Sequence, residues 1–183
     1  EKIWKPILNY AENRGVKIAI ENCPMLFTED EWPGGKNLAI SPAIWRELFK
    51  RLPSDMLGLN FDPSHFIWQE MDYIKPLYEF KDKIFHVHYK DIKVNKDARN
   101  EVGILATPLS YMLPCIPGHG DVDWAEYIRA LLEIGYKGAA CIEIEDKSFE
   151  NDKESIENSL KISRQYLKQF INFPEKGKKY EED

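Results

Sequence analysis

The sequence lacks the features that mark membrane, secreted and nucleic-acid-binding proteins. No apolar run reaches the length that spans a bilayer and no signal peptide opens the chain, so we expect no membrane partner. The three cysteines, Cys23, Cys115 and Cys141, are odd in number and have no CxxC spacing, which favours reduced thiols in a cytoplasmic protein. Lys and Arg number 25 against 31 Asp and Glu, and no basic block stands out, so we expect no nucleic-acid partner.

What the sequence does contain is typical of one ordinary folded domain. Of its 183 residues 43% are hydrophobic and 31% are charged, and 13% aromatic residues argue against disorder. We predict a single domain over residues 1–172, followed by a frayed charged tail over 173–183. The first residue is Glu1 rather than Met, and it precedes a predicted helix over 3–12, which suggests part of a longer chain.

Four short apolar runs each end in a residue that can bind a metal. Helical stretches separate these runs, so they predict parallel strands in a strand–helix repeat. The ends of parallel strands lie on one face, so the four side chains should converge. Two Glu, one Asp and one His suit a divalent cation such as Mn²⁺ or Mg²⁺. The runs cover 16–20, 57–61, 84–88 and 139–142, and the residues are Glu21, Asp62, His88 and Glu143.

Each of these residues also has an ordinary interpretation when taken alone. A strand-end glutamate such as Glu21 is often a solvated rim residue, and Asp62, which precedes Pro-Ser-His, could simply cap a turn. His86 and His88 alternate on one strand face, which favours function over a core role, with His86 one layer deeper.

Two charged residues, Lys90 and Asp91, follow the histidine strand. We expect both at the rim, where Lys90 could bind an anionic or hydroxyl-rich substrate. Helices are predicted over 42–51, near 70–80 with Pro76 in the middle, from about 121–124 to 134, and over 153–171. Residues 23–41 read as a loop. Residues 92–117 read as a long connection that should rise over the site as a lid.

Five motifs in this order resemble the xylose isomerase-like TIM-barrel superfamily. That group includes sugar phosphate isomerases and epimerases, ketose 3-epimerases, inosose dehydratases and endonuclease IV. The motifs are Ile-Glu-Asn at 20–22, Phe-Asp-Pro-Ser-His at 61–65, His-Val-His-Tyr-Lys-Asp at 86–91, Pro-Gly-His-Gly-Asp-Val-Asp-Trp at 117–124 and Ile-Glu-Ile-Glu-Asp at 142–146. The resemblance implies an α/β fold of the (β/α)₈ barrel type. Only the C-terminal four of its eight units would lie in this chain.

The resemblance also implies a metal and a chemistry. Glu21, Asp62, His88 and Glu143 would bind one divalent ion, with Mn²⁺ expected and Mg²⁺, Co²⁺ or Zn²⁺ as alternatives. Glu21 and Glu143 would also exchange protons as general base and acid around a metal-stabilised enediolate. His65 would contact the substrate.

Two departures from the family pattern narrow the choice of function. Val94 stands where ketose 3-epimerases carry a substrate-gripping arginine, which argues against a ketohexose 3-epimerase. Arg99 is the nearest arginine, and we assign it with Lys90 to substrate binding. Residues 111–113 lack the Asp-x-His pair of endonuclease IV, so a nuclease is not expected.

These inferences predict an isomerase or epimerase acting on a sugar or sugar-like polyol. A metal-dependent lyase resembling inosose dehydratase and a non-catalytic sugar-binding barrel remnant stay open as alternatives. Because four strands leave two open edges, we expect the chain to pair, either as a homo-oligomer or with an N-terminal half.

Overall fold

The computed structural model describes residues 1–24, 26, 30 and 35–171. Residues 173–183, predicted to form a frayed tail, lie outside this part, as do Glu29 and Glu31 of the 23–41 loop. The elements are α1 (Trp4–Glu12), β1 (Ile18–Glu21), α2 (Pro42–Arg51), β2 (Leu57–Phe61), α3 (Ser64–Ile67), α4 (Lys75–Glu79), the 3₁₀ turn η2 (Lys81–Lys83), β3 (Ile84–Tyr89), β4 (Asp91–Val94), α5 (Lys96–Val102), the 3₁₀ turn η3 (Pro108–Ser110), β5 (Met112–Cys115), α6 (Trp124–Glu133), β6 (Ala139–Ile142) and α7 (Lys153–Leu167).

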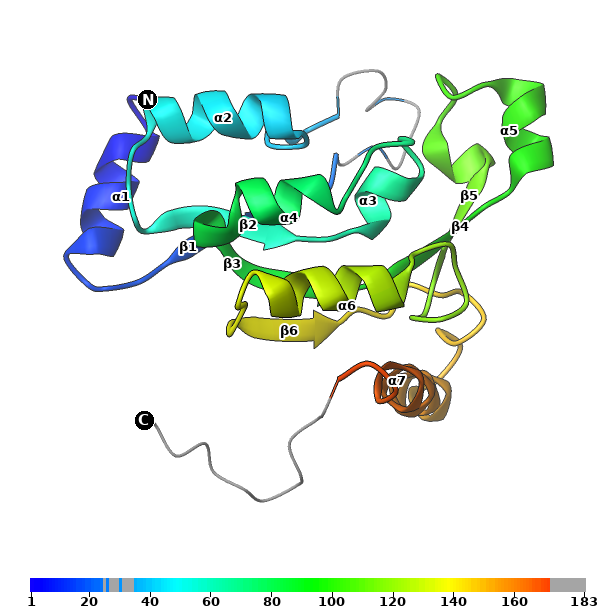
Figure 1. Ribbon diagram of the computed structural model, residues 1–183. Helices are drawn as coiled ribbons and strands as arrows, with labels where there is room; N and C mark the ends of the chain where they lie inside the picture. The colour runs from blue at the N-terminus through cyan, green and yellow to red at the C-terminus, as the bar shows by residue number, and fades with distance from the viewer. Residues whose placement is uncertain (25, 27–29, 31–34, 172–183) are drawn as a thin grey trace.

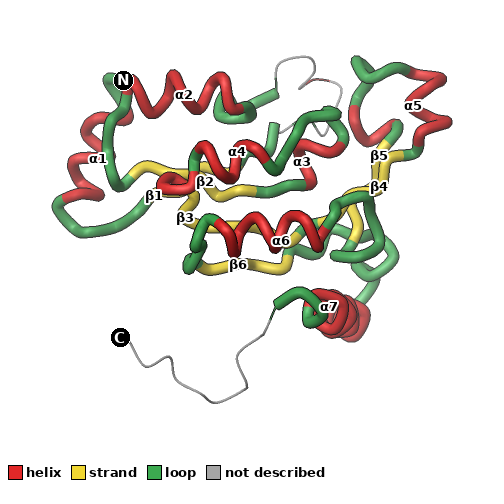
Figure 2. The backbone as a smooth tube through the Cα atoms, viewed as in Figure 1, coloured by secondary structure: helices red, strands yellow, loops and turns green. Residues whose placement is uncertain are grey.

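The main sheet has four parallel strands in the order β1-β2-β3-β6. Its registers pair Glu21 with Asn60, Phe61 with Val87 and His88 with Cys141, which brings the carboxyl ends of the strands to one edge. Helices α2, α4 and α6 run beside the strands on one face (Figures 1 and 2). This arrangement confirms the predicted α/β fold and corresponds to part of a barrel.

Aromatic side chains pack between the sheet and these helices. Trp45 of α2 lies edge-on to Phe61 of β2 and to Phe80, with ring centroids 5.9 and 5.2 Å apart. Trp124 of α6 meets Tyr89 of β3 in the same way, at 5.6 Å. Such edge-to-face pairs add specific geometry to the burial of large apolar rings. The packed face therefore fixes the strand ends that hold the polar side chains.

The two histidines of β3 share a face, as their alternation predicts. Their ring centroids are 5.5 Å apart. The pairing of β2 with β3 shifts register between Leu59 and Asn60, where Phe85 lies over Gly58. A Cβ on Gly58 would lie 2.5 Å from the Phe85 ring, so glycine is required there.

The prediction of an irregular connection over 92–117 is wrong. Strands β4 and β5 form an antiparallel hairpin, with Val94 opposite Met112, and helix α5 lies between them. Asn95 caps α5 by accepting a hydrogen bond from the Ala98 amide at 3.0 Å. The second strand was not predicted because it contains Pro114, and proline seldom lies inside a sheet. It is tolerated here because, in the described part of the chain, this sheet has two strands and both are edges.

The helix predicted near 70–80 is also corrected. Only the short helix α4 lies in this region, and Pro76 is in its first turn rather than in its middle, while α3 is a separate short helix before it. Asp72 Oδ1 starts that turn by accepting from the Ile74 amide at 2.8 Å. Helix α2 has the predicted bounds, although Ser41 makes no side-chain capping bond, and α7 ends at Leu167 rather than at 171.

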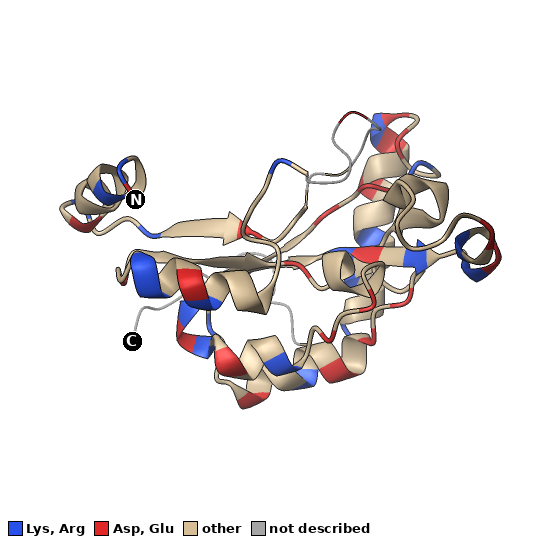
Figure 3. Cartoon of the chain, turned by 90° about the horizontal axis from the view of Figure 1, so that it is seen from above, with Lys and Arg blue, Asp and Glu red and all other residues tan. Residues whose placement is uncertain are grey.

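Positive and negative side chains are mixed along the helices. Figure 3 shows Lys and Arg interspersed with Asp and Glu along them. Within the described part of the chain, no helix is both long and apolar enough to cross a membrane.

Candidate metal centre

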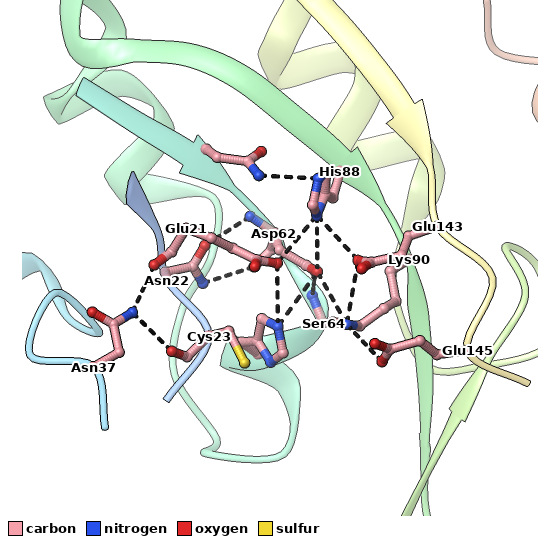
Figure 4. Close-up of polar contacts among 12 residues, drawn as sticks. Glu21, Asn22, Cys23, Asn37, Asp62, Ser64, His88, Lys90, Glu143 and Glu145 are labelled. Atoms are coloured by element: carbon pink, nitrogen blue, oxygen red, sulfur yellow. Dashed lines mark hydrogen bonds and ion pairs between the residues drawn. The ribbon is translucent and has the colours of Figure 1, made fainter. Parts of the chain in front are cut away.

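Acidic and imidazole side chains meet at the carboxyl edge of the parallel sheet. Glu21 is the last residue of β1, His88 is the next-to-last of β3, and Asp62 and Glu143 directly follow β2 and β6. One ligand-type atom of each lies within 4.8 Å of those of the others. Figure 4 shows the four side chains pointing toward one another. The structure thus brings together the residues that the strand ends predicted as ligands.

His88 lies at the middle of this group. Its Nδ1 is 3.1 Å from Glu21 Oε1, 3.1 Å from Glu143 Oε2 and 3.9 Å from Asp62 Oδ2. Its other ring nitrogen, Nε2, is 3.0 Å from Asn60 Nδ2, while Asn60 Oδ1 is buried without a partner. Turning that amide over would let Oδ1 accept from Nε2–H, the tautomer that leaves the Nδ1 lone pair for a cation.

Backbone contacts fix Asp62 and Glu21. Asn22, which is buried, donates to the Asp62 carbonyl at 2.9 Å and accepts from the Asp62 amide at 2.8 Å. The Ser64 amide donates to Asp62 Oδ1 at 2.8 Å, which leaves Oδ2 directed at the centre. Asn37 Nδ2 donates to the Glu21 carbonyl at 2.7 Å. These bonds tie the ends of β1 and β2 together.

In the metal-free protein, His65 and His88 contribute positive charge beside the carboxylates. Burial raises the pKa of Glu21, but hydrogen bonds with His65 and His88 outweigh it and leave that pKa well below its usual range. A hydrogen bond with His88 is the main cause that lowers the pKa of Glu143. Burial lowers the pKa of His88, yet its bonds to Glu143 and Glu21 prevail and raise it to about 10. The centre therefore has a strong affinity for positive charge.

The residues present fit a divalent cation. Asp62 Oδ2 and Glu143 Oε2 are buried carboxylate oxygens that face the Lys90 ammonium, at 3.7 and 3.3 Å, and His88 Nδ1, at 3.9 and 3.1 Å. Buried carboxylates need positive charge nearby, and both of these belong to predicted ligands. Three carboxylates with one imidazole form a donor set that suits Mn²⁺, Mg²⁺ or Zn²⁺.

The expectation that Lys90 and Asp91 are exposed at the rim is wrong, because both are buried. Lys90 Nζ lies 3.7 Å from Asp62 Oδ2, 3.3 Å from Glu143 Oε2 and 2.9 Å from Glu145 Oε2. Burial lowers the pKa of Lys90, but the surrounding carboxylates outweigh it and raise that pKa. Asp91 instead anchors backbone amides of the following loop.

Of the predicted substrate residues, His65 lies at the centre and Arg99 does not. His65 is buried on α3, with Nε2 3.6 Å from Glu21 Oε1 and 3.5 Å from Asp62 Oδ2. Arg99 lies on α5, where Nη1 is 2.5 Å from Glu70 Oε1, and it is not among the described residues that line the adjacent pocket. The assignment of Arg99 to substrate gains no support from this geometry.

A pocket of about 380 Å³ opens beside the centre. It shares His65, Lys90 and Glu145 with the polar cluster, and its wall includes Trp68 and Met112. Ile92, Leu109 and Pro114 of the 92–117 segment also line it, so that segment forms part of its wall. This volume is in the range of small-molecule sites.

Sequence reasoning gave no role to the three asparagines that orient the ligands. Asn22 appeared there only as part of the Ile-Glu-Asn motif, and the one signal for Asn60 was its closeness to Asp62 in the sequence. Asn37 gave none, because it reaches Glu21 from 16 residues further along the chain.

The sequence profile of the xylose isomerase-like TIM barrel family matches residues 2–168. The chain belongs to this family. Its curated relatives include the uncharacterized protein YfiH of Bacillus subtilis, 29% identical over 178 residues that cover 92% of this chain and 51% of the relative. Inosose dehydratase of Lactiplantibacillus plantarum is 29% identical over 119 residues, which cover 63% of this chain and 38% of the relative.

Solved structures of the family share the fold. The xylose isomerase domain protein of Planctomyces limnophilus aligns with a TM-score of 0.64 at 22% identity and covers 92% of this chain and 51% of its own. The IolI protein, solved with a zinc atom, aligns with a TM-score of 0.66 at 20% identity, covering 94% and 56%. This chain therefore spans about half the length of the relatives it matches.

Proposed function

We propose that the protein is a divalent-metal-dependent isomerase or epimerase of a sugar or sugar-like polyol. The observation that supports this most directly is the convergence of ligand atoms from Glu21, Asp62, His88 and Glu143 within 4.8 Å. The buried oxygens of Asp62 and Glu143, which face only His65, His88 and Lys90 among the described contacts, add to it. Mn²⁺ is our proposed ion, and Mg²⁺, Co²⁺ and Zn²⁺ are the alternatives to be tested.

The proposed reaction moves a proton between two carboxylates. When bound, the cation would polarise a sugar carbonyl and thereby acidify the neighbouring C–H. The lowered pKa values of Glu21 and Glu143 keep both side chains ionised at neutral pH in the metal-free protein. For either to accept that proton, its pKa has to rise in a substrate-bound site sheltered from water. They lie on either side of His88 Nδ1, which suits proton removal on one side of an enediolate and return on the other.

The adjacent pocket favours an uncharged polyol over a sugar phosphate. The positive charge of Lys90 is balanced by nearby carboxylates, and Glu145 and Glu150 on the lining would repel a phosphate. Trp68 supplies a buried Nε1–H donor without a partner, which a substrate hydroxyl could satisfy. His65 and Lys90 are the other proposed substrate contacts.

A metal-dependent dehydratase is the second candidate. Several curated relatives are inosose dehydratases, at 27–29% identity over 63–66% of this chain. The same ligands and the same first proton abstraction would serve, with loss of water replacing the return of the proton.

Incubation with a panel of sugars and cyclitols in deuterated water, followed by NMR, separates the candidates. An isomerase or epimerase washes deuterium into the sugar, a dehydratase releases a new product, and a binding module does neither. We expect Glu143→Gln to abolish exchange and Glu101→Gln, an exposed control on α5, to retain it.

Metal analysis tests the centre separately. We expect one Mn²⁺ per chain by calorimetry, lost in Asp62→Asn and kept in the Glu101→Gln control. If the wild-type chain and Asp62→Asn bind Mn²⁺ equally, the ion lies elsewhere and this proposal is wrong.

We also propose that the chain works in association, either as a homo-oligomer or with an N-terminal half of the barrel. The four-stranded sheet ends in β1 on one side and β6 on the other, and a closed barrel of this family type has eight strands.

A further inference from the structure

Lys90 occupies the boundary between the metal centre and the pocket. Its ammonium lies within 4 Å of three carboxylates, those of Asp62, Glu143 and Glu145, and its side chain is only 5% exposed. The same residue also lines the pocket. Figure 4 shows it reaching into the group of carboxylates.

The three partners of Lys90 differ in kind. Asp62 and Glu143 are proposed metal ligands, whereas Glu145 lies two residues beyond Glu143 and is not part of the ligand set. Of the three contacts, the one with Glu145 at 2.9 Å is at ordinary hydrogen-bond length, and those with Glu143 at 3.3 Å and Asp62 at 3.7 Å are longer ion pairs. Buried carboxylates that lose a cation partner are costly, so something must neutralise Asp62 and Glu143 whenever no metal is bound.

We infer that Lys90 is a built-in counter-ion of the centre. It holds Asp62 and Glu143 in place in the metal-free protein, and it competes with the metal for both. Once a metal binds these carboxylates, Lys90 stays anchored by Glu145 and its remaining N–H donors become available to an oxygen in the pocket. The inference rests on the proposed function for the existence of the metal.

The chemistry of lysine suits this role. A compact ammonium on a flexible four-carbon stem can withdraw from a carboxylate, whereas the planar guanidinium of arginine forms rigid paired bonds. The charges agree with this division: Glu21, Asp62, Glu143 and Glu145 contribute four negative charges against three from Lys90 and a divalent ion, so Lys90 keeps Glu145 as a counter-charge when the ligands bind the metal.

Mn²⁺ titration of the full chain carrying Lys90→Met tests the inference. Removing a positive charge 3.3–3.7 Å from two ligand oxygens should tighten Mn²⁺ binding by about 10-fold in calorimetry. The melting temperature in EDTA should fall, and its rise on adding Mn²⁺ should exceed that of the wild type. A purely structural lysine predicts the opposite sign, namely weaker Mn²⁺ binding in the variant.

Two further variants keep the test decisive even if Lys90→Met folds poorly. Glu145→Gln, at a half-exposed site, removes the carboxylate that holds Lys90 without being a proposed metal ligand. Lys90 should then compete more strongly with Mn²⁺ for Asp62 and Glu143, so Mn²⁺ should bind about 3-fold more weakly. Lys81→Met, at an exposed lysine of η2 away from the pocket, should leave Mn²⁺ affinity unchanged.

The possible failures are distinguishable. Unchanged or weaker Mn²⁺ binding in Lys90→Met, or tighter binding in Glu145→Gln, overturns the counter-ion role while the metal centre stands. Absence of Mn²⁺ binding by the wild-type chain overturns the metal centre itself, and with it the inference.

Discussion

The two oxygens of Asp62 face different surroundings, and the difference explains how a single carboxylate can serve both the fold and a site. Oδ1 accepts the Ser64 amide and so closes the turn that the Asp-Pro-Ser-His motif predicts. Oδ2 has no hydrogen-bond partner and faces His65, His88 and Lys90. The turn-capping and ligand interpretations of Asp62 are therefore compatible.

The raised pKa of His88 predicts a pH-dependent stability of the metal-free protein. The folded value is about 10 against an ordinary 6.5, so protonated His88 stabilises the fold fully below pH 6.5. That stabilisation is lost as the pH rises to about 10. We expect the melting temperature in EDTA to fall between pH 7 and pH 10, with a smaller fall in His88→Gln.

Mn²⁺ should reverse this trend, because the metal and the proton compete for His88 Nδ1. Its affinity should rise with pH over the same range, with proton release measurable by calorimetry in buffers of different ionisation heat. His119→Gln, at an exposed histidine, serves as the control. A melting temperature in EDTA that is equal at pH 7 and pH 10 would contradict the assigned role of His88.

Asp91 is expected to be a residue of stability rather than of binding. Its carboxylate is fully buried and accepts from the Ile92, Gly118 and Val122 amides and from Trp124 Nε1, at 2.8–3.0 Å. Asp91→Ala would orphan these donors and should lower the free energy of unfolding by about 3 kcal/mol or more. Urea denaturation measures this, and Asp82→Ala, on the surface, should change it little. A loss below about 1 kcal/mol would show that water replaces the carboxylate.

At the scale of elements, the Pro-Gly-His-Gly motif receives a structural explanation. A Cβ on Gly120 would lie 2.2 Å from Asp91 Oδ1 and 2.4 Å from the Ile92 carbonyl, so only glycine fits beside the buried carboxylate. Gly118 has φ +95, a conformation that other residues rarely adopt. This family motif thus builds the loop around Asp91.

The hairpin of β4 and β5 offers a test at the same scale. The part of the pocket wall that this hairpin supplies consists of Ile92, Leu109, Met112 and Pro114. At the base of the hairpin tip, the Asn95 amide donates to the Tyr111 carbonyl at 2.8 Å. Replacing residues 96–110 with Asn-Gly, a two-residue hairpin turn, keeps the strand pairs but removes Leu109 and α5.

We expect this shortened hairpin to lower sugar turnover more than ten-fold, because the pocket loses part of the wall that excludes water, while Mn²⁺ affinity stays unchanged. Turnover, calorimetry and the melting temperature are compared with the wild type. Equal loss of turnover and stability, or loss of neither, would count against a role as pocket cover.

Across the whole molecule, local patterns predicted the strand ends but not the contacts between distant segments. The apolar runs ending at Glu21, Asp62 and Glu143 are short and bounded, so parallel pairing followed from the strand–helix alternation. The burial of Lys90 was not predictable, since it depends on Asp62, 28 positions earlier, and on Glu145, far later in the chain. The hairpin was missed because Pro114 breaks the strand pattern.

The last prediction concerns the open sides of the sheet. Among the described residues, strands β1 and β6 each pair on one side only, and Ala139, Ala140 and Cys141 of β6 are exposed. Unpaired edges and an inner face of small, accessible side chains favour pairing with another chain. Light scattering at micromolar concentration should therefore give a mass above the 21.4 kDa of one chain. Ala139→Lys, which places a charge on the edge strand, should shift the protein toward the monomer without loss of Mn²⁺ binding. A wild-type monomer that melts cooperatively would mean that the edges are protected within the chain itself.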